Sequence, residues 1–206
     1  MRFPISSLIA AAVTALLFSS CGTSSLSILP SGSSLRDPAP PSPQLLAVAR
    51  SKPKDRHSMP VYAFGERNRY VRTTAYTCSE ADHVQYGSAN AIGTTLKYNY
   101  RVRSAAADWS FYPLGTVFKI KGHSQLYVVD DYGSALTGTG TIDLYQPSRD
   151  LMNVWGRRHV EIVVLQWGSL DRSAEVLAKR TKYAHCRRMH ANIQRMRSAI
   201  AATAMR

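Results

Sequence analysis

Short β-rich segments, separated by glycine and proline, fill the middle of the chain between Arg69 and Trp167 and limit the folds open to it. Their β-branched and aromatic residues favour strands, and the glycine-rich stretches between them exclude long helices. Strands are expected over residues 69–77, 116–120, 126–130, 142–145 and 158–167, with one short helix over 148–154. Many short strands joined by tight turns predict a small, mainly β barrel.

Two segments of different composition flank this region. Residues 22–68 are rich in serine and proline, which predicts a disordered, flexible tether. The end of the chain predicts a basic helical tail, for which a solvated helix face is the simplest interpretation and attraction to anionic lipid or wall polymer is the alternative. The expected organisation is a signal peptide over 1–20, a tether over 21–68, a barrel domain over 69–168 and a helical tail over 169–206.

The N-terminus has the features of an export signal. After Arg2, an apolar run over residues 8–18 is too short to span a bilayer, which takes about 20 residues, and is typical of a signal peptide. Small residues then precede Cys21, as in the lipobox of bacterial lipoproteins, although Phe18 departs from the leucine-like residue usual there. We expect Cys21 to be acylated and the protein to be anchored in the cell envelope, in the outer membrane or facing the periplasm. An ordinary secretory signal is the alternative.

Charge and cysteine content limit the partners. The chain has 26 Lys and Arg against 13 Asp and Glu, a net charge of +13, and therefore attracts polyanions. For an exported chain these are anionic lipid or wall polymer, and no nucleic-acid partner is expected. If Cys21 is acylated, Cys78 and Cys186 could form a disulfide, with two free thiols as the alternative. No spacing of Cys or His is typical of a metal site, and neither a metal nor a cofactor is expected.

Four motifs occur in a fixed order in the barrel region. They are TAYT at 74–77, ADWSFYPLGT at 107–116, VVDDYGSALTGTGTIDLY at 128–145 and WGRRHVEIVVL at 155–165. Together they resemble the three-aspartate (3D) domain, a double-psi β-barrel shared with membrane-bound lytic transglycosylase A and several bacterial wall proteins. Asp108, Asp131 and Asp143 occupy the three aspartate positions.

The sequence departs from the family pattern in three respects. Ser134 stands where a second glycine is usual, and the loop before Asp143 is one residue longer, at about Gly140. In the transglycosylase, the barrel is joined to a second, larger domain, which this sequence is not expected to have.

The resemblance implies cleavage of peptidoglycan glycan strands between N-acetylmuramic acid and N-acetylglucosamine, by a lytic transglycosylase or a related glycosidase. The role of catalytic acid and base carries over to Asp143, with Asp131 as the neighbouring carboxylate that raises its pKa. One acid suffices for transglycosylation, because the sugar's own 6-hydroxyl attacks and closes a 1,6-anhydro ring. Asp108 is expected to be a supporting structural cap. The alternative function is that of a non-catalytic peptidoglycan-binding lipoprotein.

Local sequence supports the choice of Asp143. It lies between Ile142 and Leu144 in an apolar strand, so it should point away from the core. Aspartate is unfavourable in strands, which favours a functional role. Asp130 is expected to be exposed and without a role. The candidate substrate-binding residues are Thr74, Tyr76, Trp109, Tyr132 and Gly133, although core packing is favoured for any single aromatic among them.

The lipid anchor can be tested with Cys21→Ser. The variant should move from the membrane fraction to the soluble fraction of the cell envelope, as measured by fractionation in high salt. A variant that stays in the membrane fraction under those conditions would show that Cys21 is not the anchor.

Overall fold

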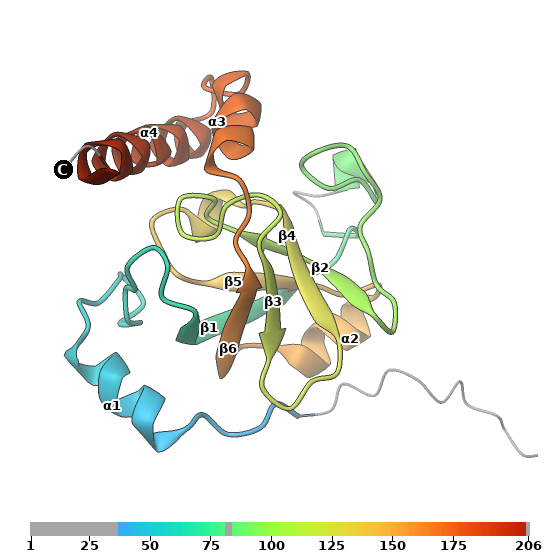
Figure 1. Cartoon of the computed structure of the whole chain (residues 1–206). Coiled ribbons are helices and arrows are strands. Elements are labelled where there is room, and N and C mark those ends of the chain that lie inside the picture. Colours follow the sequence, from blue (N-terminus) through green and yellow to red (C-terminus); the bar gives the residue numbers. More distant parts are fainter. Residues whose placement is uncertain (1–36, 81–83, 205–206) are drawn as a thin grey trace, which may run out of the picture. The chain divides into compact units, whose positions relative to one another are not determined.

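The computed structural model describes residues 37–80 and 84–204, and its strands form a barrel (Figure 1). Within this part of the chain the strands are β1 (Asn68–Tyr76), β2 (Val102–Ala107), β3 (Val117–Ile120), β4 (Leu126–Asp131), β5 (Ile142–Tyr145) and β6 (Arg158–Gln166). Their hydrogen-bonded order is β1-β5-β2-β4-β3-β6, and β6 pairs with β1 to close the barrel. The pairs β1·β5 and β2·β4 are parallel, and the other four are antiparallel.

The core of the barrel follows from alternation along the strands, which places every second side chain inside. Strand β5 shows this directly, since Ile142 and Leu144 are fully buried while Asp143 between them is partly exposed. The short helix α2 (Arg149–Trp155) begins where the hydroxyl of Ser148 accepts a hydrogen bond from the backbone N–H of Leu151. Both the alternation and this helix agree with the sequence prediction.

Strand β2 was not predicted. Its sequence, VRSAAA, is rich in alanine, which is depleted in strands. The strand lies between β4 and β5 in the sheet, so its backbone groups are paired on both sides. Pairing with β4 shifts register between Ala105 and Ala106, where Ala105 lies opposite Val129 and Ala106 opposite Asp131. Tertiary pairing, rather than side-chain propensity, makes this segment a strand.

The tether prediction is wrong for residues 37–68. Helix α1 (Pro43–Ser51) lies in this stretch and buries Leu45 and Ala49. The backbone N–H of Ala39 donates to the carbonyl of Lys121, and Met59 is also buried. A folded layer therefore precedes β1, and the domain begins at least thirty residues earlier than expected. The signal peptide and Cys21 lie outside the described residues and remain predictions.

The helical tail is confirmed as helix, but it is not a solvated appendage. It forms helices α3 (Leu170–Ala178) and α4 (Ala184–Ala204), drawn in orange to red in Figure 1. Leu177, Cys186, Met189 and Ile193 are fully buried and belong to the same hydrophobic cluster as the barrel interior. No helix within the described residues is both long and apolar enough to cross a membrane. The C-terminal segment is therefore part of the domain's core.

The proposed Cys78–Cys186 disulfide is absent, since both cysteines are free thiols. Cys186 is fully buried in the main core, whereas Cys78 packs against a separate, smaller apolar cluster that contains Tyr145. The hydroxyl of Tyr145 lies 3.8 Å from the Cys78 sulfur. Packing, not a covalent link, attaches the C-terminal helices to the barrel.

A close backbone contact connects the last strand to those helices. A Cβ on Gly168 would lie 2.3 Å from the carbonyl oxygens of Pro113 and Leu114, so only glycine fits there. The backbone N–H of Ser169 donates to the Leu114 carbonyl, and the Ser173 hydroxyl accepts from the Leu114 N–H. The PLGT turn thus holds the start of α3 at a fixed position.

We expect Gly168→Ala to destabilise the protein by about 3 kcal/mol, the upper end for steric overpacking, because the colliding atoms are backbone. Urea unfolding measures the change. The matched control is Gly140→Ala, whose added Cβ would lie 3.9 Å from the nearest atom and should cost little. Equal stability of the two variants would show that the contact at Gly168 can relax.

Candidate active site

The sheet register places two of the three aspartates on either side of one small residue. Asp143 on β5 lies opposite Ala106 on β2, and Asp131 on β4 lies opposite Ala106 on its other side. Neighbouring strands are about 4.8 Å apart, so the two backbones are about 10 Å apart with only a methyl group between them. The carboxylates can therefore share one solvent space on the outside of the barrel wall.

Asp143 is held by a residue of β1, the strand that runs parallel to β5. Thr74 lies opposite it on β1, and the Thr74 hydroxyl donates a hydrogen bond of 2.7 Å to the carboxylate. Burial raises the pKa of Asp143 to about 6; the Thr74 hydrogen bond opposes this rise, while the charges of Glu80 and Asp131 add to it. Such a carboxyl can both give and take a proton near neutral pH, as a general acid and base requires.

Both carboxylate oxygens of Asp131 accept hydrogen bonds. The hydroxyl of Tyr76 donates to one carboxylate oxygen at 3.0 Å, and the backbone N–H of Tyr132 donates to the other at 2.9 Å. Burial, followed by the charge of Asp131, raises the pKa of Tyr76 well above its usual value, so its hydroxyl keeps its proton and remains a donor. Tyr76 therefore orients Asp131.

Asp108 is buried and accepts hydrogen bonds from two loops. It is fully buried and accepts hydrogen bonds from the backbone N–H and the hydroxyl of Ser110, at 2.8 and 2.7 Å. Its second oxygen accepts from the backbone N–H of Gly138 at 2.6 Å. Burial raises the pKa of Asp108 despite these donors. It connects the loop after β2 to the loop that leads into Asp143.

The prediction that Asp130 is exposed is wrong. Its side chain is buried, with hydrogen bonds of 2.8 Å from the Lys97 ammonium and 2.9 Å from the Ser104 hydroxyl. The bulge between β2 and β4 places Asp131, not Asp130, opposite Ala106. The two members of the doublet therefore have different roles, and Asp130 anchors the loop that carries Lys97.

A cavity of about 760 Å³ opens over Asp131 and Asp143. Its floor consists of residues from β1, β2, β4 and β5. One wall comes from the loop between β1 and β2, including Glu80 and Asn90, and another from the loop after β4, including Tyr132 and Gly133. The remaining wall comes from the C-terminal segment that joins α3 to α4 and from the first turn of α4. Together they contribute Lys179, Arg180, Lys182, Tyr183 and His185.

The substrate-binding candidates divide into three groups. Tyr76, Tyr132 and Gly133 line the cavity, and Thr74 acts through its hydrogen bond to Asp143. Trp109 is fully buried, with its indole N–H bonded to the carbonyl of Asp131, so it supports the site from inside the core and offers no surface for a sugar.

Sequence reasoning missed several residues that line the cavity. Glu80 raises the pKa of Asp143 more than Asp131 does, yet it belongs to no motif. Tyr183 and His185 stack with ring centroids 5.8 Å apart, and His185 also contacts the ring of Tyr132. The run of alanines around Ala106 was the one sequence signal for the cavity, because small side chains leave space above a sheet.

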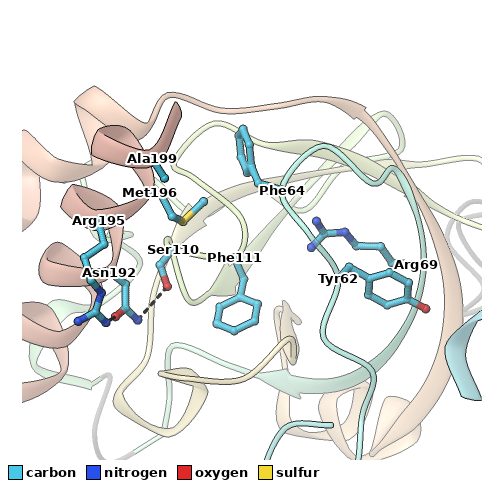
Figure 2. A pocket seen from close by; sticks show the side chains of 9 residues that line it. All are labelled: Tyr62, Phe64, Arg69, Ser110, Phe111, Asn192, Arg195, Met196 and Ala199. Atoms are coloured by element: carbon cyan, nitrogen blue, oxygen red, sulfur yellow. Dashed lines mark hydrogen bonds between the residues drawn. The ribbon is translucent and has the colours of Figure 1, made fainter. Parts of the chain in front are cut away.

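A second cavity, of about 460 Å³, lies between α4 and the segment that leads into β1 (Figure 2). Asn192 on α4 lies within 3.5 Å of the Ser110 hydroxyl, and Phe111 and Phe64 supply apolar surface (Figure 2). None of its lining residues is acidic, so it offers no group for proton transfer to a sugar. Among the described residues, no group of three or more His, Cys, Asp or Glu side chains could hold a metal ion.

The comparisons with known proteins bear on the same region. Residues 103–166 match the family model of the 3D domain, and this stretch includes all three aspartates. The chain contains a 3D domain. That family is associated with peptidoglycan-related domains of the lytic transglycosylase type. No curated protein matches the chain. The 3D match begins in β2, so β1 with Thr74 and Tyr76 lies outside it.

The raised pKa of Asp143 predicts a pH-dependent effect on stability. Because the folded pKa of about 6 exceeds the ordinary value of 3.8, the carboxyl favours folding below pH 3.8 and loses this contribution as the pH rises through 6. Asp143→Asn replaces the carboxyl with an amide that does not ionise, so the variant does not lose this stability as the pH rises. It should stabilise the protein at pH 8 by at most about 3 kcal/mol and have little effect at pH 4, measured by urea unfolding.

The exposed Asp150→Asn is the control and should show no gain at pH 8. An Asp143→Asn variant with the same stability change at both pH values would show that the Asp143 carboxyl is not desolvated.

Proposed function

We propose that this protein cleaves the glycan strands of peptidoglycan, with Asp143 as the acid and base. The observation that carries the proposal is a largely buried carboxyl with a pKa of about 6 at the floor of an open cavity, in the last aspartate position of a 3D domain. The cavity of about 760 Å³ is in the range of sites that bind small ligands.

The chemistry requires one proton donor at the glycosidic oxygen. Protonated Asp143 gives its proton to the leaving sugar oxygen, and the resulting carboxylate takes the proton from the attacking hydroxyl. When that hydroxyl is the sugar's own 6-hydroxyl, the product is a 1,6-anhydro sugar. Asp131 and Glu80 favour the protonated form of Asp143 through their charge, and Thr74 orients it.

We further propose a double-psi topology for the barrel and an envelope location. Two parallel strand pairs within an otherwise antiparallel barrel support the topology. The apolar run and Cys21 support a lipid-anchored protein facing the periplasm, in the outer membrane. In this setting the expected partners are glycan strands and the membrane that holds the anchor.

A second candidate function is non-catalytic binding of peptidoglycan. It is favoured by the aromatic wall of Tyr132, His185 and Tyr183, which could hold a sugar without cleaving it. Purified sacculi, digested with the full chain and analysed by mass spectrometry, distinguish the candidates. Anhydro-muropeptides indicate a transglycosylase and new reducing ends a hydrolase, whereas binding without products indicates a binder.

Asp143→Asn keeps the hydrogen-bonding shape but cannot give a proton, so glycan cleavage should fall by about a hundredfold to ten-thousandfold while binding persists. The rate of the parent should fall as the pH rises through about 6, because the protonated carboxyl is the active form. Asp131→Asn should shift this profile to lower pH, because it removes a charge that raises the pKa of Asp143. The readout is release of soluble muropeptides across a pH series.

Asp108→Asn should act mainly on thermal stability, and the exposed Asp150→Asn should match the parent in both assays. Cleavage by Asp143→Asn at the parent rate would remove Asp143 from the catalytic role and leave the binding function as the better explanation.

A further inference from the structure

The C-terminal segment brings cations to the edge of the proposed active site. Lys179, Arg180 and Lys182 line the same cavity as Asp131 and Asp143, although they lie far from these aspartates in the sequence. Among the five ion pairs found within residues 37–80 and 84–204, none involves any of the three. Positive charge at this wall is therefore not neutralised by a protein carboxylate in direct contact.

The three cations differ in how they are held. Arg180 is fixed, because its guanidinium donates a 3.0 Å hydrogen bond to the Tyr132 hydroxyl. Lys179 and Lys182 are exposed, and the ammonium of Lys182 lies 5.0 Å from the centre of the Tyr183 ring. Arg180 is thus a positioning residue for the wall, while the two lysines are available to a ligand.

The position of this wall is set by the fold. The PLGT turn fixes the start of α3 through Gly168 and Ser173, and Cys186 and Met189 are buried immediately after the segment. Residues 179–185 are therefore anchored at both ends. A fixed cationic wall beside an aromatic surface suits a ligand that has an uncharged sugar ring and, next to it, a negative charge.

We propose that Lys179 and Lys182 form a subsite for the carboxylates of the stem peptides, so that the protein acts on glycan that still carries its peptides. This inference rests on the proposed function, because it assigns a substrate class to the same cavity. In a strand whose N-acetylmuramic acid residues are all substituted, the negative charges belong to the stems and not to the sugars. A stem leaving the glycan at the cavity would bring its carboxylates to the lysines.

The test uses two forms of one substrate. Sacculi freed of phosphate-containing polymers are used either as they are or after their carboxylates have been converted to methylamides with carbodiimide and methylamine. The full chain is compared with Lys179→Gln/Lys182→Gln and with a charge-matched control, Arg157→Gln/Arg172→Gln, whose exposed arginines do not line the cavity. Binding by sedimentation and release of muropeptides are both measured, and thermal unfolding checks the fold.

The parent should prefer untreated sacculi by about tenfold, since each exposed charge pair contributes modestly, and salt should reduce this preference. The lysine variant should lose the preference yet equal the parent on methylamide sacculi, while the control variant should behave like the parent. Loss of the preference in both variants would assign it to net charge and overturn the subsite.

Two other outcomes also contradict the subsite and differ from each other. A parent that binds or cleaves both forms equally overturns the carboxylate subsite but leaves the proposed function intact. A parent that neither binds nor cleaves either form overturns the proposed function together with the subsite.

Discussion

The pairing of β2 between β4 and β5 is the constraint on which the site depends. It places Ala106 between Asp143 and Asp131, and the bulge in β4 decides which member of the Asp130–Asp131 doublet lies beside it. A larger side chain at this position would fill the space that the two carboxylates share. The cavity over the sheet, the raised pKa of Asp143 and the orientation of Asp131 all follow from this register.

Two segments cover the outer face of the barrel wall, which would otherwise be an ordinary solvent-exposed surface. The loop between β1 and β2 packs on it through a small cluster that includes Leu96, Ala106 and Tyr145, and this cluster is separate from the barrel interior. The C-terminal segment covers the same face from the other side. Burial of Asp143 on the outside of a barrel is therefore produced by two segments that lie far apart in the sequence, and desolvation is the largest cause of its raised pKa.

Much of this arrangement could be predicted from local sequence, and the rest depends on tertiary contacts. The alternation of residues in the strand around Asp143 correctly predicted that its side chain points away from the core. The ordered motifs predicted the 3D domain. Strand β2 was missed because alanine has no strand preference. The burial of the tail was missed because its basic charge obscured the apolar residues Cys186, Met189 and Ile193, which are spaced for one helix face. Glu80 reaches the site through a loop, where no periodicity exists to reveal it.

Because Ile193 is buried in the core, that core cannot be complete before the chain has been synthesised as far as α4. The barrel needs β6 to pair with β1, and its core is completed by residues of α4. A nascent chain that has emerged only as far as β6 would therefore expose apolar surface where α4 belongs. Complete packing of the core must therefore wait until the chain has been made as far as Ile193.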